Sequence, residues 1–99
     1  MSRTLTPIMP GEILLEEFLE PLGISQNELA RAISVPPNRI SQIINGKREI
    51  TADTALRLGR FFGIEPEFWL NLQTRYNMKI ARTLLGNELE KSVEVYNQA

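Results

Sequence analysis

Residues 25–47 read SQNELARAISVPPNRISQIINGK, and this stretch decides the fold of the chain. Ser25 and Glu28 have the spacing of a capping box, which predicts the start of a helix. Pro37 favours the first turn of a second helix, because the amide that proline lacks has no partner there. Gly46 ends that second helix. The pattern therefore predicts two short helices joined by a tight turn, a helix-turn-helix.

The second of these helices has two unlike faces. With about 100° of rotation per residue, one face holds Ile40, Ile43 and Ile44, and the other, the amide face, holds Asn38, Gln42 and Asn45. An ordinary solvated face is the alternative, but the centre of this one carries no Lys or Glu. Asn and Gln present a donor and an acceptor together, which matches the edge of adenine in the major groove. We therefore expect the amide face to contact DNA bases, with Arg39 on its flank reaching a guanine or a phosphate.

Other polar side chains around the motif are placed to contact DNA phosphates. Gln26 lies in the first turn of the first helix of the motif, where backbone amides favour an anion, although a merely exposed residue is an equal alternative. Lys47 and Arg48 follow the second helix and would add affinity without sequence preference. Ser41, on the flank of that helix, is a weaker candidate.

Composition restricts the class of protein. Ninety-nine residues with 42% hydrophobic content allow one compact domain. The absence of Cys and His excludes disulfides, zinc fingers and thiol catalysis, and removes the commonest general base. We therefore expect no enzyme, no metal site and no cofactor. No apolar run has the length of a membrane span and no signal peptide is visible, so we expect a cytoplasmic protein with no membrane partner.

The net charge of −1 is unevenly distributed. Residues 25–60 carry six basic and three acidic side chains, a local charge of +3, whereas residues 1–24 sum to −3 and residues 61–99 to −1. Attraction to phosphate depends on the local patch, so this distribution favours salt-dependent binding to nucleic acid.

Apolar residues recur at helical spacing along the chain, which indicates an all-α fold. We expect an extended arm over residues 1–9, a DNA-binding domain over residues 10–82 with the helix-turn-helix at 25–46, and an extension over residues 83–99. Apolar residues recur at helical spacing in the extension, which is compatible with a short last helix.

Helix boundaries follow from proline and capping residues. The first helix is expected from about residue 11 to residue 19, because the residue before Pro21 avoids the helical region. Thr51 caps a fourth helix. Pro66 begins a fifth, which we expect to run to about Arg82.

Two side-chain clusters fall outside the motif. The acidic line of Glu12, Glu16 and Glu20 is most simply a solvated face, and as an alternative it would dock a basic protein partner. Phe68, Trp69 and Tyr76 are most simply core, although some of this aromatic surface would suit an interface with a second copy. A basic run follows on the same helix, made of Arg75, Lys79 and Arg82.

Beyond these local patterns, the chain resembles a known family. The helix-turn-helix resembles that of the lambda-repressor/Cro group, and the wider sequence over about residues 8–82 resembles HigA-type antitoxins, also called virulence-associated protein I. The resemblance rests on PGEIL at 10–14, LEPLG at 19–23, NGKR at 45–48, ITADTALRL at 50–58 and PEFWLNLQ at 66–73.

This resemblance implies a compact five-helix fold and a homodimeric antitoxin of a bacterial type II toxin–antitoxin pair. Such a protein binds a HigB-type toxin, a small basic ribonuclease that cuts messenger RNA, and represses its own operon at a pseudo-palindromic DNA operator. The family's DNA-contacting positions fall on Pro37, Asn38, Arg39 and Gln42, with Pro37 placed against a phosphate although it has no amide to donate. One departure is Ser34, where glycine is common, so a left-handed backbone there would cost energy.

Alternative functions stay open at this level. A stand-alone regulator without a toxin would share every DNA-binding feature. A protein-binding module would use the acidic first helix and keep the helix-turn-helix only as scaffold. An enzyme is disfavoured further by the lack of a phosphate-binding loop.

Overall fold

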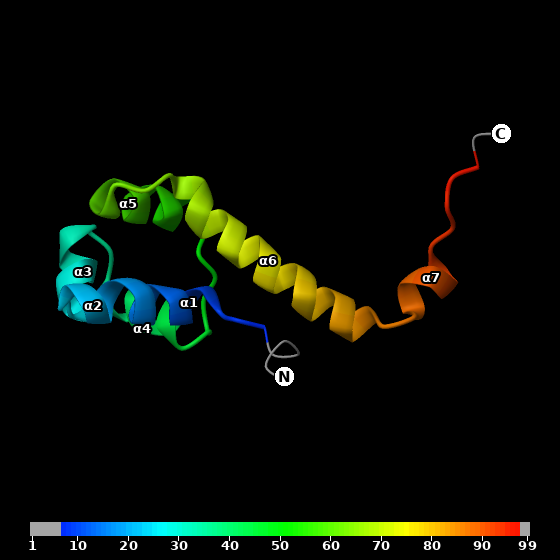
Figure 1. Ribbon diagram of the computed structural model, residues 1–99, viewed down its shortest axis with the longest axis horizontal. Coiled ribbons are helices and arrows are strands. Elements are labelled where there is room, and N and C mark those ends of the chain that lie inside the picture. The colour runs from blue at the N-terminus through cyan, green and yellow to red at the C-terminus, as the bar shows by residue number, and fades with distance from the viewer. Residues whose placement is uncertain (1–6, 98–99) are drawn as a thin grey trace.

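The computed structural model describes residues 7–97, which contain helices and no strands. The helices pack around one core, and the last of them lies beyond it (Figure 1). In chain order they are α1 (Pro10–Ile13), η2 (Leu14–Leu19), α2 (Glu20–Leu22), α3 (Gln26–Ala32), α4 (Pro37–Ile44), α5 (Ala52–Phe62), α6 (Pro66–Leu85) and α7 (Glu88–Ser92). Because α1, η2 and α2 are continuous, they form one helix. The predicted all-α fold of five helices and a short last helix is confirmed.

The first helix continues across Pro21, which corrects the predicted end before this proline. Glu20 is helical, with φ −65° and ψ −50°, and the helix ends at Leu22. In an α-helix the proline ring would press on the carbonyl four residues back. The turn before it is a π-helix, in which the Glu20 amide donates to the Leu15 carbonyl five residues back. We attribute the continuity of the helix to this wider turn.

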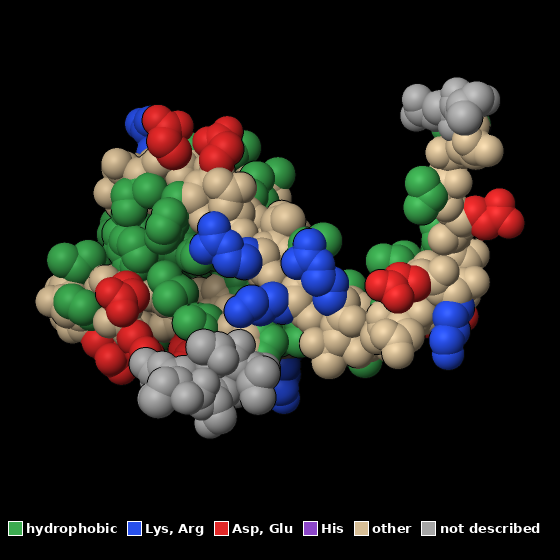
Figure 2. Space-filling view, turned by 45° about the vertical axis from the view of Figure 1, so that its right-hand side comes forward, with side chains coloured by type: hydrophobic (Ala, Val, Ile, Leu, Met, Phe, Trp, Pro, Cys, Tyr) green, Lys and Arg blue, Asp and Glu red, His purple; other side chains and the backbone are tan. Residues whose placement is uncertain are grey.

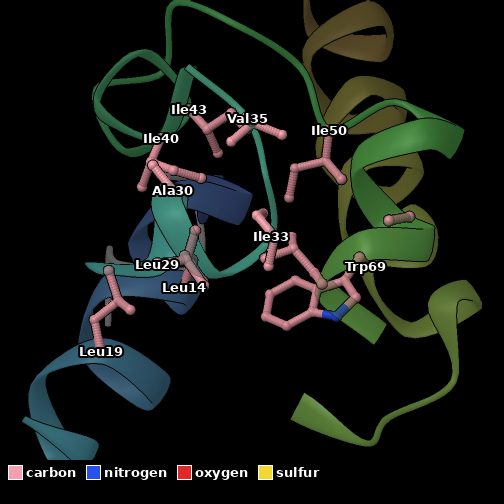
Figure 3. Close-up of a cluster of buried hydrophobic side chains, with 12 residues drawn as sticks. Leu14, Leu19, Leu29, Ala30, Ile33, Val35, Ile40, Ile43, Ile50 and Trp69 are labelled. Atoms are coloured by element: carbon pink, nitrogen blue, oxygen red, sulfur yellow. The ribbon is translucent and has the colours of Figure 1, made fainter. Parts of the chain in front are cut away.

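The core lies between the first helix, α3, α4, α5 and the start of α6 (Figure 3). Its fully buried side chains include Leu14, Leu29, Ile40 and Leu58. Trp69 is the largest of them, and the centroid of its ring lies 4.8 Å from the centroid of the Phe18 ring. Through this indole ring the core joins α6 to the first helix.

Gly11 allows the first helix to approach α4 very closely. A Cβ atom placed on Gly11 would lie 2.0 Å from the carbonyl oxygen of Ile43 and 2.6 Å from the Cα of Ile44. Only glycine fits here, so the backbone of α1 directly supports the end of α4.

A buried amide fixes the loop between α4 and α5. Gln73 of α6 is 7% exposed, and its Oε1 accepts a hydrogen bond from the Ile50 amide at 2.8 Å. Its Nε2 donates to Asn77 Oδ1 at 3.1 Å, and Asn77 Nδ2 donates to Glu49 at 3.4 Å. Through these bonds α6 holds the chain that leaves the helix-turn-helix.

The C-terminal part projects from the body. The helix α6 runs to Leu85, three residues beyond the predicted Arg82, and α7 confirms the short last helix. The principal extents of 55 × 33 × 21 Å reflect this projection, which Figure 1 shows in yellow and orange. Within residues 7–97, no helix is long and apolar enough to cross a membrane.

Candidate DNA-binding surface

The helix α4 buries Ile40 and Ile43, leaves Ile44 half-buried, and turns its amides outward, as predicted. Ile40 is 0% and Ile43 is 2% exposed, whereas Asn38 and Asn45 are exposed and Gln42 is half-buried. Asn45 is the C-cap residue rather than part of the helix. The amide face is therefore available at the surface of this chain, while its contacts with bases stay a prediction.

Local sequence explains how the motif begins. The Glu28 amide donates to Ser25 Oγ at 3.0 Å, and the Ser25 amide donates to Glu28 Oε1 at 2.8 Å. This confirms the predicted capping box. The pKa of the Glu28 carboxyl is lowered, first by the hydrogen bond from the Ser25 backbone amide and to a smaller extent by the one from the Ser25 hydroxyl. Pro37 is the first residue of α4, also as predicted.

The turn between α3 and α4 has the geometry of a Schellman motif with serine at its left-handed position. Ser34 has φ 59° and is the one non-glycine residue with positive φ in the described chain. The Val35 amide donates to the Ala30 carbonyl at 3.0 Å, and the Ser34 amide donates to the Arg31 carbonyl at 3.3 Å. The backbone strain expected at Ser34 is therefore present.

Replacing Ser34 with glycine is expected to stabilise the protein by about 0.5–1 kcal/mol, because glycine adopts this backbone conformation without a Cβ clash. The midpoint of thermal unfolding, followed by circular dichroism, should rise by roughly 3–6 °C. Ser34→Ala is the matched control: it keeps the Cβ atom and should give no increase. Equal midpoints for the two variants would contradict this account.

Side chains beside the amide face contact one another. Arg48 Nε donates to Gln42 Oε1 at 3.0 Å, and Asn45 Nδ2 lies 3.5 Å from Ser41 Oγ. The Lys47 amide donates to the Gln42 carbonyl at 2.8 Å, which closes the end of α4. Lys47 and Arg48 are exposed, so their charges lie at the end of the amide face.

Arg39 is held by an ion pair that the sequence did not predict. Its Nη1 lies 3.8 Å from Asp53 Oδ1, and its Nε is buried without a hydrogen-bond partner among the described residues. Arg57 donates to the same Asp53 oxygen at 2.7 Å. Its Nη1 also donates to the carbonyls of Ile33 at 2.8 Å and of Ser34 at 3.3 Å. Asp53 and Arg57 thus connect α5 to α4 and to the turn that follows α3.

The remaining predicted site residues take various positions. Gln26 begins α3 and is half-buried, and Pro37 is exposed. The acidic line of Glu12, Glu16 and Glu20 is exposed along the first helix.

Trp69 is completely buried, so its side chain offers no surface to a second copy, whereas Phe68 and Tyr76 are half-buried. Among residues 7–97 no group of three or more His, Cys, Asp or Glu side chains could hold a metal ion.

Comparison with known proteins places these features in a family. The helix-turn-helix family matches residues 15–69. Virulence-associated protein I of Dichelobacter nodosus is 55% identical over 74 residues, which cover 75% of this chain and 68% of that protein. A solved HigA-family addiction module antidote protein from Coxiella burnetii is 53% identical with a TM-score of 0.86, over 91% of this chain and 98% of that one. The chain belongs to the HigA family of helix-turn-helix proteins.

One solved HigA structure includes DNA. The Pseudomonas aeruginosa antitoxin HigA with the higBA promoter is 42% identical to this chain and has a TM-score of 0.87, over 92% of this chain and 99% of that one. The HigA family is a DNA-binding class and not an enzymatic one, in agreement with the class of protein that the sequence predicts.

Proposed function

We propose that this protein is a bacterial, cytoplasmic antitoxin that represses its own operon by inserting α4 into the major groove of operator DNA. The observation that carries this proposal is the amide face of α4, where Asn38 and Asn45 are exposed and Gln42 is half-buried, opposite the buried Ile40 and Ile43. A solved HigA antitoxin with its promoter, at a TM-score of 0.87, supports it. In this proposal residues 10–82 form the DNA-binding unit and residues 83–99 an extension that serves another contact.

We propose that some of these residues contact bases and others contact phosphates. Asn38, Gln42 and Asn45 read base edges, and Arg39 joins them when it leaves Asp53. Backbone contacts fall to Gln26, Pro37, Ser41, Lys47 and Arg48. The positive segment of the chain, +3 over residues 25–60, would add salt-dependent affinity.

Replacing Gln42 with alanine is expected to reduce the preference for operator over random duplex by about 1–3 kcal/mol, because one bidentate base contact is lost. Fluorescence anisotropy at one fixed salt concentration measures both affinities. Lys47→Ala is the matched comparison: a lost phosphate contact should weaken both duplexes by the same factor. If Gln42→Ala leaves the ratio of the two affinities unchanged, the assignment of Gln42 to a base is wrong.

The proposed protein partner is a HigB-type toxin, a small basic ribonuclease that cuts messenger RNA. The exposed acidic line of Glu12, Glu16 and Glu20 has the charge to attract such a protein. Co-purification with the product of the neighbouring reading frame tests this partner.

The proposed DNA-bound form is a homodimer on a pseudo-palindromic operator, with half-sites about one helical turn apart, roughly 34 Å. Phe68 and Tyr76 are the predicted interface residues that keep some exposed surface. The projecting C-terminal segment supports dimer formation too, because its hydrophobic side chains are exposed in the single chain (Figure 2).

A further inference from the structure

We infer that Arg48 is a positioning residue for base recognition: its guanidinium bridges a DNA phosphate and the side-chain amide of Gln42, and so fixes which way that amide faces the bases. The inference rests on the proposed function and deepens it, because it makes the sequence preference depend on a residue beyond the amide face. The observation that carries it is the hydrogen bond between the two side chains.

This hydrogen bond fixes the orientation of the Gln42 amide. Arg48 Nε donates to Gln42 Oε1 at 3.0 Å. A guanidinium has donors and no acceptor, so the atom of Gln42 that faces it is the carbonyl oxygen. A glutamine without such a partner turns its amide over easily, because its last torsion is broad and roughly two-fold. The second lone pair of Oε1 stays free, so the fixed amide still presents an acceptor beside its Nε2 donor.

The backbone on both sides of Arg48 is held by hydrogen bonds. The Lys47 amide donates to the Gln42 carbonyl at 2.8 Å, which folds the chain back against the end of α4. On the other side, the Ile50 amide donates to Oε1 of the buried Gln73, also at 2.8 Å. The Arg48 side chain therefore reaches Gln42 from a backbone that two other contacts hold in place.

The rest of the Arg48 guanidinium is free to contact DNA. Arg48 is exposed, and within residues 7–97 it forms no ion pair. While Nε binds Gln42, the donors of both terminal nitrogens are available for a phosphate oxygen, and hydrogen bonds between charged groups are the stronger kind. A phosphate that holds the guanidinium would hold the Gln42 amide through it. Contact with the DNA backbone and recognition of a base are thereby coupled.

This coupling predicts two separate effects of removing Arg48. Loss of the phosphate contact weakens binding to every duplex. Loss of the hydrogen bond to Gln42 frees the amide to turn over, which lowers the preference for one base pair. In a protein that already lacks the Gln42 amide, only the first effect remains. The two residues should therefore be non-additive in sequence preference.

The test compares full-length Arg48→Ala, Gln42→Ala and the double variant. Arg48 is exposed, so circular dichroism should show unchanged folding. Fluorescence anisotropy at one fixed salt concentration measures binding to the promoter duplex of the protein's own operon and to its single base-pair variants. Arg48→Ala should lower the preference about threefold to tenfold at the base pair where Gln42→Ala also lowers it, and at no other. The double variant should show the same preference as Gln42→Ala.

Two further variants serve as controls. Lys47→Ala removes the neighbouring exposed charge and should weaken binding to all of these duplexes by the same factor. Asn38 belongs to the amide face but lies at the opposite end of α4 from Arg48. The preference that Asn38→Ala loses should therefore add to the loss from Arg48→Ala.

Uniform weakening by Arg48→Ala, or unchanged binding, would overturn the inference, because the arginine would then have no influence on the amide. A loss of preference that persists in the Gln42→Ala background would overturn it too, since Arg48 would then contact a base itself. A wild-type protein that binds the promoter duplex no better than a random duplex would instead refute the proposed function. The two failures are therefore distinguishable.

Discussion

Replacing Gly11 with alanine is expected to destabilise the protein by about 3 kcal/mol, although the same change in an ordinary helix stabilises it. The added Cβ atom would meet the backbone of α4, 2.0 Å from the Ile43 carbonyl oxygen. Because backbone cannot move aside as a flexible side chain does, α1 and α4 must separate. Urea unfolding should show a lower midpoint at an unchanged slope, and the thermal midpoint should fall by more than about 10 °C.

The neighbouring residue provides the control for this variant. Glu12 is exposed on the same turn, and Glu12→Ala should change the free energy of unfolding by less than about 0.5 kcal/mol. Because Gly11 supports the end of α4, operator affinity of the Gly11→Ala protein should fall even under conditions where it remains folded. A Gly11→Ala variant as stable as the wild type would mean that α1 and α4 are not packed this closely.

Replacing Trp69 with alanine is expected to cost about 3–5 kcal/mol, the range for removing a buried aromatic side chain. Trp69 is fully buried, and its ring lies 4.8 Å from Phe18 and 5.0 Å from Phe68. Circular dichroism should follow the unfolding, because the chain has a single tryptophan and the variant loses its fluorescence. The variant should unfold at a much lower urea concentration.

Trp69→Phe separates the contribution of packing from that of the indole nitrogen. The Trp69 Nε1 atom is buried without a hydrogen-bond partner among the described residues, so its removal leaves no other group unsatisfied. We therefore expect Trp69→Phe to cost less than half as much as Trp69→Ala. Equal losses for the two variants would contradict this separation.

Local rules predicted much of the fold. The capping box of Ser25 and Glu28, the cap at Thr51 and the helix start at Pro66 each depend on residues close in sequence, and each is confirmed. The orientation of α4 was predictable because isoleucine and amide residues alternate at helical spacing. The same reasoning failed at Pro21: Glu20 keeps helical φ and ψ before the proline, and the preceding π-helical turn relieves the clash of the ring with the carbonyl four residues back.

Contacts between distant residues were not predictable from one sequence. Gln73 bonds Ile50 across 23 positions, and Arg57 bonds the Ile33 carbonyl across 24. The i, i+4 spacing of Asp53 and Arg57 was a visible signal for their ion pair. Nothing in the spacing indicated that Asp53 would also reach Arg39. The burial of Trp69 likewise depends on helices that meet only in the folded chain.

The position of Asp53 between two guanidinium groups has a consequence for discrimination among DNA sites. In the proposed base contact, Arg39 would exchange the Asp53 carboxylate, 3.8 Å away and 62% exposed, for an acceptor on the DNA. The paired O6 and N7 atoms of guanine provide a bidentate acceptor, whereas an adenine at the same position does not. On a mismatched duplex the arginine would remain with its carboxylate. The ion pair with Asp53 would thus add a small preference for guanine at the position that Arg39 contacts.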